Sequence, residues 1–418
     1  MRLLACLVTM LVVGRAAAQA FRPAVLKVGL YRAKPPVQVA VGCSRELVVS
    51  AGGRTTRLSP PRTLSVRAVG SRIAITGPGL PATAEGAVFR SETGQIRIDG
   101  RSFRGSVRIR ANGGRLVIVN DVGLEDYVRA VVPNEMRSDW PAEALKCQAV
   151  VARTLAAARL GRHASQGFDL CDTTHCQVYR GSGFESARAS AAAAATAGQV
   201  LAFAGRPIEA FYCSTCGGIS ANTLGARPIR SVPYLRVRKD ILHGATACKE
   251  SPHYSWRSRL DRSAVASALG GPVTSIRVAS RDVSGRARLV VLRGCAAREM
   301  DASEFMNTVC RKLGWATIKS TMFSVACSGT FFTFTGHGLG HGIGLCQWGA
   351  KKRAESGWGY GRILQFYYPG ARVQPLRNLP RFDKLETTHP PTHIREKTRN
   401  LAGIGIVRMV GTGEGALC

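Results

Sequence analysis

One carboxylate in the sequence stands out because of the residues beside it. Glu135 lies in a short segment in which Val131, Val132, Pro133 and Met136 are all apolar. Apolar surroundings disfavour the charged form of a carboxyl group and raise its pKa, so that the group can stay protonated near neutral pH. General acid catalysis requires such a protonated group. We therefore predict that Glu135 protonates a leaving oxygen; the alternative is a solvated helix-capping residue.

A second group of residues has the side chains that bind metals. His163, Cys171, His175 and Cys176 lie close together in a segment rich in glycine and aspartate. Two imidazoles and two thiolates suit tetrahedral zinc, although the spacing is not that of a zinc finger. Two interpretations stay open, a structural zinc site and a disulfide with free histidines. A catalytic zinc is disfavoured because four protein ligands leave no open position.

A glycine-dense segment carries two further histidines, His337 and His341. Their spacing suits metal ligands on a helix, but glycines at positions 336, 338, 340, 342 and 344 disfavour a helix there. We predict a loop that lines a cleft, where missing side chains let a substrate approach the backbone. Structural packing of the two histidines is the alternative.

Two helices are expected to position Glu135. The first covers Leu124–Val132 and stops at Pro133, because proline removes a backbone donor. The second runs from Pro141 to about Leu160, with Asp139 as a capping side chain and alanines recurring on one face. Lys146 and Arg153 lie two turns apart on this helix, either as solvated surface or as the lining of a groove.

The remaining segments predict an α+β fold. From residue 21 to about 122, short alternating runs separated by Gly, Pro and Asn indicate antiparallel strands and hairpins. Later segments alternate between short helices, at 263–269 and 302–313, and further hairpins. We expect an N-terminal β-rich region followed by a domain of mixed helices and antiparallel strands.

The net charge of +32 on 418 residues predicts binding to polyanions, namely nucleic acid, anionic lipid surfaces or acidic wall polymers. Arg2, the apolar run LLACLVTMLVV and the small residues that follow form the pattern of a secretory signal peptide over residues 1–20. Export to the periplasm, cell envelope or exterior makes nucleic acid an unexpected target. An oxidising compartment favours disulfides, and Cys216 with Cys248, and Cys213 with a downstream cysteine, are candidate pairs.

Several segments in order resemble the sporulation stage II protein D / LytB amidase-enhancer family. They are LEDYVRAVVPNEM, WPAEALKCQAVVARTLA, CDTTHCQVYRG, FYCSTCGG, VPYL, GHGLGHGIGLCQWGA and ILQFYYPG. The resemblance implies a family catalytic domain over residues 115–370, and the β-rich region 21–114 is similar to what commonly precedes it. The polar, basic and Pro-containing composition of the tail, 371–418, predicts disorder. The resemblance also implies that zinc is held by the His163, Cys171, His175 and Cys176 group in some members.

The resemblance implies a peptidoglycan lytic transglycosylase that cuts glycan strands stripped of their peptides, with Glu135 as the catalytic acid. Lys146 and Tyr234 are implied in activity, and Arg236 stands where the family has a lysine. No catalytic cofactor is expected. Further candidates for binding sugar hydroxyls are Arg153, Gln177, Tyr179, Ser214 and Gln347, together with His337 and His341.

The mechanism implied for this family needs one carboxylate. Ordinary glycosidases use two, whereas here the C6 hydroxyl of N-acetylmuramic acid attacks its own C1 and forms a 1,6-anhydro ring. The rival function is a non-catalytic wall-binding protein that stimulates an N-acetylmuramoyl-L-alanine amidase. A zinc hydrolase is a third and more distant option.

Overall fold

Three hydrophobic cores organise the part of the chain that the computed structural model describes, residues 25–59, 62–91, 95–224, 227–228, 232–294 and 298–379. Helices and antiparallel strands are mixed, which confirms the predicted α+β class. The predicted signal peptide, residues 1–20, lies outside the described residues, as does the chain beyond Leu379. None of the described helices combines the length and the apolar character needed to cross a bilayer.

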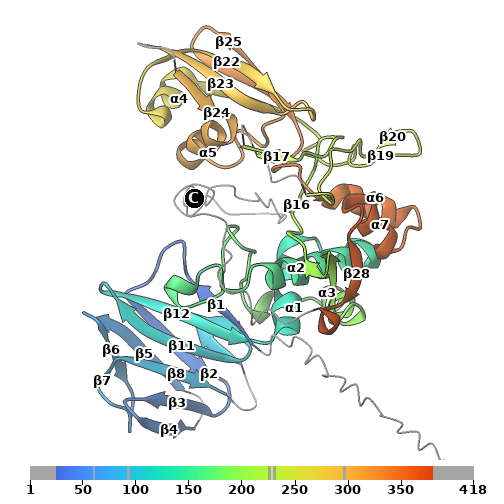
Figure 1. The fold of residues 1–418 in the computed structure, drawn as a ribbon. Helices are drawn as coiled ribbons and strands as arrows, with labels where there is room; N and C mark the ends of the chain where they lie inside the picture. The colour runs from blue at the N-terminus through green and yellow to red at the C-terminus, as the bar shows by residue number, and fades with distance from the viewer. Residues whose placement is uncertain are drawn as a thin grey trace, which may run out of the picture.

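The first core lies between two sheets, seen at the lower left of Figure 1, which are antiparallel except where the edge strand at residues 170–171 joins in parallel. Side chains alternate between buried and exposed along the strands, as in β11, because successive residues point to opposite faces. The sheet nearest the helices has the order β13-β1-β12-β11-β8-β3-β4 and the other β10-β9-β2-β5-β6-β7. Their strands are β1 (Leu26–Leu30), β2 (Gln38–Cys43), β3 (Leu47–Ala51), β4 (Arg54–Leu58), β5 (Arg62–Val69), β6 (Arg72–Thr76), β7 (Thr83–Ala84), β8 (Gly86–Arg90), β9 (Ile96–Ile98), β10 (Arg101–Phe103), β11 (Ser106–Asn112), β12 (Arg115–Val122) and β13 (Leu170–Cys171).

The predicted boundary at residue 114 falls inside this sheet. Strand β12 begins at Arg115 and pairs with both β11 and β1, and β13 joins the same sheet from beyond the helices. The first core also includes side chains of the helices that follow. The β-rich region and the start of the next region are therefore packed together.

Helix α1 (Leu124–Glu135) continues beyond its predicted end at Val132. Pro133 removes one backbone hydrogen bond, which costs about 3 kcal/mol inside a helix. Burial of each large apolar side chain contributes roughly 1.5–3 kcal/mol, and the N–H of Met136 still donates to the Val132 carbonyl at 2.9 Å. Packing therefore outweighs the proline, and Glu135 becomes the last residue of the helix. The buried side chains of α1 include Tyr127, Val128, Val131 and Val132.

Helix α2 (Ala142–Ala158) packs against α1 and α3 (Ala187–Ala195) through a face of buried alanines, as predicted. Its cap differs from the prediction. The residue before the helix is Pro141, which makes no side-chain cap, and Asp139 instead pairs with Arg137 at 2.6 Å. Short 3-10 turns flank this region at Ala164–Gln166 and Ser182–Phe184.

The second core lies beneath the other side of α2. It includes two helices near the C-terminal end, seen in orange-red at the right of Figure 1, and several short strand pairs. The elements of residues 199–246 and 345–378 are β14 (Gln199–Phe203), β15 (Arg206–Pro207), β16 (Tyr212–Cys213), β17 (Thr223–Leu224), β18 (Arg227–Pro228), β19 (Ile241–Leu242), β20 (Ala245–Thr246), β27 (Leu345–Cys346), α6 (Gln347–Glu355), α7 (Tyr360–Tyr367), β28 (Arg372–Pro375) and a 3-10 turn, Leu376–Asn378.

The predicted start of the tail at residue 371 is wrong. Strand β28 pairs with β14, with Leu201 opposite Val373, and Leu376 and Leu379 are buried in the first core. The segment reads as polar and basic, but pairing to a distant strand orders it. The rest of the predicted tail lies outside the described residues.

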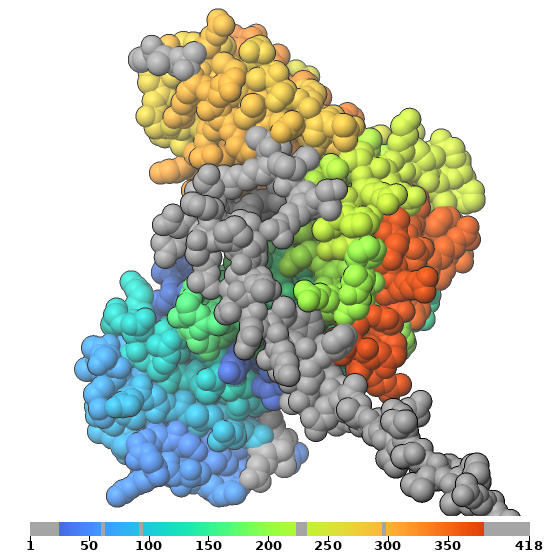
Figure 2. Space-filling view, viewed as in Figure 1, coloured from blue at the N-terminus to red at the C-terminus, as the bar shows by residue number. Residues whose placement is uncertain are grey.

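Residues 255–337 form an insert with a core of its own, seen in yellow and orange at the top of Figure 1. In the space-filling view the insert and the β-sheet region lie at opposite ends of the face shown (Figure 2). The insert consists of two three-stranded sheets and two helices. The helices α4 and α5 match the two predicted helices and end at the predicted residues, Leu269 and Leu313. Its elements are β21 (Ser255–Asp261), α4 (Arg262–Leu269), β22 (Val273–Arg281), β23 (Ala287–Gly294), β24 (Arg298–Asp301), α5 (Ala302–Leu313), β25 (Phe323–Ser328) and β26 (Phe331–His337).

Every described cysteine is a free thiol, which corrects the predicted disulfides. The sulfurs of Cys216 and Cys248 lie 3.7 Å apart, far beyond the ~2.05 Å of a disulfide bond. Cys213 is likewise free and buried.

Candidate active site

Glu135 lies at the C-terminal end of α1 and is fixed by contacts from two distant segments. The backbone N–H of Val178 donates to its Oε1 at 2.8 Å. The side-chain amide of Gln347, the first residue of α6, donates to its backbone carbonyl at 2.8 Å. The residue is only 5% exposed, so its carboxyl group is held more deeply than a surface capping residue would be.

The surroundings of this carboxyl group are polar, whereas the sequence predicted an apolar turn. The neighbouring valines and Met136 point into the core. Burial raises the pKa of the Tyr212 phenol well above its ordinary value, and the nearby Glu135 carboxylate raises it further. Gln177 accepts a hydrogen bond from Tyr127 at 3.2 Å. Tyr212 therefore stays protonated beside Glu135.

Two buried polar groups beside Glu135 lack a well-aligned hydrogen-bond partner within the described ranges, although the Tyr212 hydroxyl lies within bonding reach of Gln177 and Glu135. Neither the Tyr212 hydroxyl nor the Gln177 amide nitrogen completes a hydrogen bond of good geometry with the described part of the chain. Buried polar groups are normally satisfied, so each exception needs an explanation such as water or substrate. The amide oxygen of Gln148 accepts a hydrogen bond from Gln347 at 3.1 Å. Its amide nitrogen likewise has no hydrogen-bond partner among the described residues.

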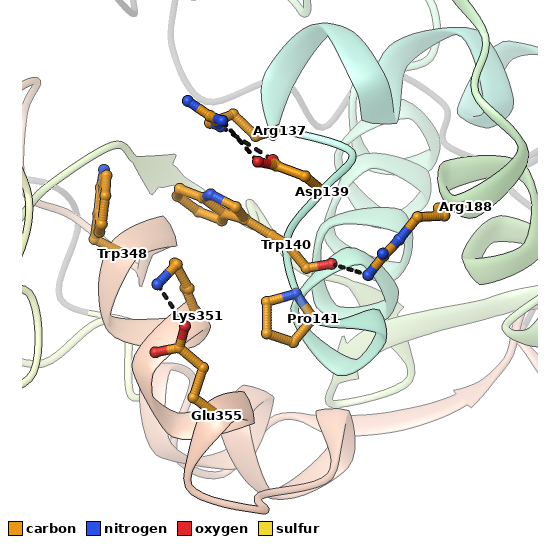
Figure 3. A pocket seen from close by; sticks show the side chains of 8 residues that line it. All are labelled: Arg137, Asp139, Trp140, Pro141, Arg188, Trp348, Lys351 and Glu355. Atoms are coloured by element: carbon orange, nitrogen blue, oxygen red, sulfur yellow. Dashed lines mark hydrogen bonds and ion pairs between the residues drawn. The ribbon is translucent and has the colours of Figure 1, made fainter.

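An open pocket of about 470 Å³ lies next to the segment that follows Glu135. Figure 3 shows the indoles of Trp140 and Trp348 in its wall, edge to face with ring centres 5.0 Å apart. Arg188 of α3 donates to the Trp140 carbonyl at 3.0 Å. Glu135 itself does not line this pocket, but Gln347, which holds the Glu135 carbonyl, precedes Trp348. The lining residues are Arg137, Asp139, Trp140, Pro141, Arg188, Trp348, Lys351 and Glu355.

Lys146 and Tyr234, the other predicted catalytic residues, have partners of their own. Lys146 pairs with Glu143 at 2.6 Å, and its ammonium lies 5.8 Å from the ring centre of Tyr360 in α7. Tyr234 is half-buried and packs against Phe203 of β14, with ring centres 5.7 Å apart. The structure thus groups Lys146 with α7 and Tyr234 with β14, not with the Val178, Tyr212 and Gln177 side of Glu135.

Arg236, the predicted counterpart of a family lysine, is exposed. Its guanidinium donates to the backbone carbonyl of Pro233 at 2.9 Å. This contact leaves the rest of the side chain in solvent.

The predictions of substrate contact for Arg153 and Tyr179 are corrected by their contacts, because both side chains are buried and their polar groups have partners inside the fold. Arg153 forms a bidentate pair with Glu125, at 2.7 and 2.8 Å, and also donates to three backbone carbonyls. Tyr179 stacks on Tyr127 and donates to Asn120 at 2.7 Å. Both side chains use their polar groups inside the fold and are structural.

Three other predicted sugar-binding residues lie near Glu135 or the pocket. Gln177 and Gln347 are buried beside Glu135, as described above. Ser214 is half-buried, and its carbonyl accepts the N–H of Trp348 at 3.1 Å. Sequence reasoning missed Tyr212 and Gln148, although both stand in segments that it singled out.

The glycine-dense segment is a loop, as predicted, but its glycines serve the fold. A Cβ on Gly338 would lie 2.6 Å from the Thr215 carbonyl, and one on Gly342 would lie 2.1 Å from Arg286. Their φ angles of 80° and 77° also favour glycine. The missing side chains therefore admit the protein's own backbone and Arg286, and nothing in this geometry requires a glycan.

The two histidines of this segment have structural contacts. His337 ends β26, and its Nδ1 lies 3.1 Å from the Tyr254 carbonyl. His341 Nδ1 accepts the N–H of Ile343 at 3.0 Å. Burial, with the positive charges of Arg286 and Arg159, lowers the pKa of His341 to about 4, so it is neutral at pH 7.

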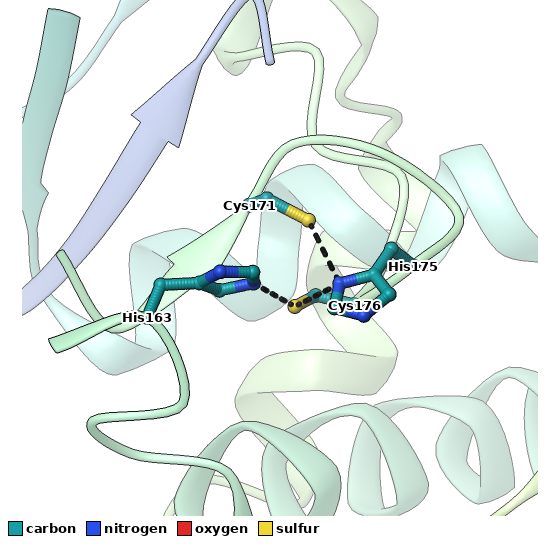
Figure 4. A group of neighbouring side chains, drawn as sticks. All are labelled: His163, Cys171, His175 and Cys176. Carbon is teal, nitrogen blue, oxygen red and sulfur yellow. Dashed lines mark hydrogen bonds between the residues drawn. The ribbon is translucent and has the colours of Figure 1, made fainter. Parts of the chain in front are cut away.

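His163, Cys171, His175 and Cys176 converge, as Figure 4 shows. Their ligand atoms all lie within 4.8 Å of one another. Nitrogen-to-sulfur distances are 3.4 Å for His163 with Cys176 and 3.6 Å for His175 with Cys171; the edges of a tetrahedral zinc site are about 3.6 Å. Hydrogen bonds from Cys176 and from both histidines lower the pKa of Cys171. The donor set and its geometry thus fit zinc, and neither cysteine is in a disulfide.

The family described as Stage II sporulation protein matches residues 112–203, which include α1, α2, the loop with the His163 cluster and α3. The stage II sporulation protein D of Bacillus amyloliquefaciens is 30% identical over 274 residues, 61% of this chain and 75% of that protein. The amidase enhancer of Bacillus subtilis (strain 168) is 30% identical over 332 residues, and the chain spans 45% of its length. A Brachyspira hyodysenteriae protein is 29% identical over 313 residues, 82% of its length.

The matched region contains Glu135 and the loop with His163, Cys171, His175 and Cys176, and the likeness to the Bacillus amyloliquefaciens protein extends over most of that protein. The order of motifs along the sequence agrees with this result. The chain belongs to the stage II sporulation protein D family.

Proposed function

We propose that the protein is a peptidoglycan lytic transglycosylase that cuts denuded glycan strands, with Glu135 as its general acid and base. The observation that carries the proposal is the position of Glu135. Its carboxyl group is fixed at the end of α1 by the Val178 N–H, next to buried polar groups of Tyr212 and Gln177 that have hydrogen-bonding capacity to spare within the described residues.

The other carboxylates near this helix pair support a mechanism with one acid. Glu125 pairs with Arg153, Asp139 with Arg137 and Glu143 with Lys146. Asp126 likewise pairs with Arg129. Glycosidases with two carboxylates need the second as nucleophile or base, and carboxylates engaged in ion pairs are poor candidates. An internal hydroxyl nucleophile removes that need, because its effective concentration is high.

The reaction can be written so that the proton returns to Glu135. The protonated carboxyl gives its proton to the oxygen between N-acetylmuramic acid C1 and N-acetylglucosamine, and the C1–O bond breaks. The carboxylate, stabilised by the Val178 N–H, then takes the proton of the C6 hydroxyl as C6–O bonds to C1. Tyr212, which stays protonated, and Gln177 would donate hydrogen bonds to the sugar. The products are a 1,6-anhydro-N-acetylmuramic acid end and a free N-acetylglucosamine hydroxyl.

The pocket beside Trp140 and Trp348 supports binding of a sugar chain next to Glu135. Aromatic faces pack against the apolar faces of sugars, and the guanidinium groups of Arg137 and Arg188 add donors at its rim. We propose that this pocket binds the glycan because it offers both aromatic faces and guanidinium donors.

We also propose that His163, Cys171, His175 and Cys176 hold a structural zinc ion. Four protein ligands close the site, so the ion would stabilise and not react. The zinc site lies close to Glu135 along the chain, because Val178, whose N–H donates to Glu135, follows Cys176 by two residues. The zinc would fix the loop that positions the acid.

Export to the cell envelope completes the proposal. A net charge of +32 attracts anionic wall and membrane surfaces. The expected partners are glycan strands and this anionic envelope, not nucleic acid.

The decisive test compares wild type with Glu135→Gln on denuded glycan strands, with mass spectrometry for 1,6-anhydro ends. Wild type should produce such ends, and Glu135→Gln, which keeps the shape but cannot cycle a proton, should produce none. Glu46→Gln, an isosteric change at an exposed ion pair far along the sequence, should behave as wild type. Equal activity of Glu135→Gln and wild type would refute the assignment.

A second function, stimulation of a cell-wall amidase without catalysis, is favoured by one relative and one observation. The Bacillus subtilis relative is named an amidase enhancer, and Glu135 is 5% exposed, which restricts access to its carboxyl group. If neither wild type nor Glu135→Gln yields anhydro ends while both accelerate an added N-acetylmuramoyl-L-alanine amidase, this function replaces the first.

A further inference from the structure

A second cluster of metal-ligating side chains lies in the core around β16, β27 and α6. It consists of Cys216, Asp240, Cys248 and Cys346, whose ligand atoms lie within 4.8 Å of one another. All four residues are buried, and they come from three separate segments of the chain. We propose that they form a structural site for a zinc-class divalent ion, with three thiolates and one carboxylate as ligands.

The distances agree with tetrahedral coordination. The sulfurs of Cys216 and Cys248 are 3.7 Å apart, and two thiolates ~2.3 Å from one tetrahedral ion lie about 3.8 Å apart. Cys216 Sγ is 3.2 Å from Asp240 Oδ2, a few tenths of an ångström inside the roughly 3.6 Å of a sulfur–oxygen edge. A disulfide would need the sulfurs at ~2.05 Å and would leave one of the three thiols unused.

The neighbours of Asp240 resemble the outer partners of a metal ligand. Arg353 donates to Asp240 Oδ1 at 2.6 Å and the hydroxyl of Tyr367 donates to the same oxygen at 3.0 Å. These bonds orient the carboxylate so that Oδ2 faces Cys216, as hydrogen bonds to metal-bound carboxylates do. Arg353 is itself fully buried, and its positive charge offsets part of the negative charge of three thiolates and a carboxylate around a divalent ion.

The chemistry of binding is an exchange of protons for metal. Three S–H bonds break, three protons leave to solvent and three metal–sulfur bonds form, with no change of oxidation state. Sulfur-rich ligands select zinc over magnesium or calcium, and four protein ligands leave no open position, so the ion is structural.

The site would tie together the walls of the candidate active site. Cys346 directly precedes Gln347, whose amide holds the Glu135 carbonyl. Cys216 follows β16, which carries Tyr212. Asp240 and Cys248 lie in the connection that leads to the insert at residue 255. One ion would therefore cross-link the start of α6, the segment after β16 and the connection that leads into the insert.

The test is a count of bound zinc on the full chain, purified under reducing, anaerobic conditions and equilibrated with Zn²⁺. Together with the His163 cluster, the proposal predicts two zinc ions per chain. Cys216→Ser/Cys248→Ser should retain one, and Cys171→Ser/Cys176→Ser should also retain one. Cys310→Ser, which removes an equally buried thiol from the core of the insert, should retain both.

A spectroscopic measurement identifies the ligands. Co²⁺ added to the metal-free Cys171→Ser/Cys176→Ser chain should give tetrahedral d–d bands and a thiolate-to-cobalt charge-transfer band. The charge-transfer band should lose intensity with the further change Cys346→Ser, which removes one of three thiolates, and should be unchanged with Cys213→Ser, because Cys213 is not one of the four proposed ligands.

Two results would overturn the proposal. One is no second zinc on the wild-type chain while all of its thiols react as free, a result that does not depend on any variant folding. The other is a Cys216–Cys248 disulfide, found by peptide mass spectrometry, in a chain that after reduction still binds no Co²⁺ at this cluster. Neither result bears on whether Glu135 cleaves glycan, which the anhydro-end assay measures separately.

Discussion

At the level of single residues, buried polar side chains distinguish this protein. Glu135, Tyr212, Gln148 and Gln177 all lie inside the fold, where an unsatisfied polar group costs about 1–3 kcal/mol. Keeping such groups together next to one carboxyl group is expensive for stability. Such a loss of stability is expected at a binding site, where a bound molecule completes the hydrogen bonds of these side chains.

His341 gives a prediction for the dependence of stability on pH. Its pKa is about 4 in the folded chain and ~6.5 when unfolded, so the unfolded state binds the proton first as the pH falls. The contribution of neutral His341 is fully present above about pH 6.5 and is lost progressively toward pH 4. We expect His341→Gln to make the fall in the free energy of unfolding between these pH values shallower, as measured by urea denaturation.

Other groups also titrate in this range, so the comparison needs a histidine control. His243→Gln, at an exposed turn, should follow the wild-type curve. Parallel curves for wild type and His341→Gln would contradict the assignment of a depressed pKa to this residue.

At the level of secondary-structure elements, ion pairs and small side chains hold the helices that position Glu135. Arg153 of α2 reaches Glu125 of α1 and also donates to the carbonyls of Ala193 in α3 and Gln199 in β14. One fully buried guanidinium therefore joins four elements. Alanines on α2 allow the helices to approach closely enough for these contacts.

We predict that Arg153→Met destabilises the fold by about 3 kcal/mol, because it removes a fully buried guanidinium that bonds the carbonyls of Ala193 and Gln199 and pairs with the partly exposed Glu125 carboxylate. Arg129→Met is the matched control, since Arg129 pairs with Asp126 of the same helix at a half-exposed site, and it should cost under about 0.5 kcal/mol. Urea unfolding of the two variants measures the difference. Equal losses would show that the buried pair has no special role.

At the level of the whole molecule, the net charge determines long-range attraction to other molecules, and the arrangement of the elements determines the geometry of the site. The net charge of +32 describes what the protein is attracted to, and the three cores describe how the site is built. Elements far apart in sequence contribute to the site: α1, the loop at residue 178, β16 and α6. The insert at residues 255–337 separates β16 from α6 in sequence, although β16 and β27 pair directly.

The charge predicts binding to anionic cell-wall material that weakens as salt is added. Screening shortens the reach of exposed charges from about 10 Å at 0.1 M salt to about 3 Å at 1 M. Cosedimentation with walls that carry anionic polymers should fall steeply over this range, and equally for wild type and Glu135→Gln. Walls stripped of those polymers should bind less at low salt; binding that ignores both salt and polymer would contradict an electrostatic role.

The sequence by itself determined the family, the α+β class, the two helices around Glu135 and the candidate residues of the His163 cluster, because these depend on local patterns and ordered motifs. It misjudged Pro133 and the start of the tail, where packing against distant segments outweighs local preference, and Asp139, which pairs with the nearby Arg137 and does not cap the helix. Only the tertiary structure decided that Arg153 and Tyr179 are buried, that Tyr212 and Gln148 lie near Glu135, and that Cys216, Asp240, Cys248 and Cys346 meet. The physical reason is that burial and contact between residues far apart in the chain arise from the packing of whole elements, and no spacing in the sequence records it.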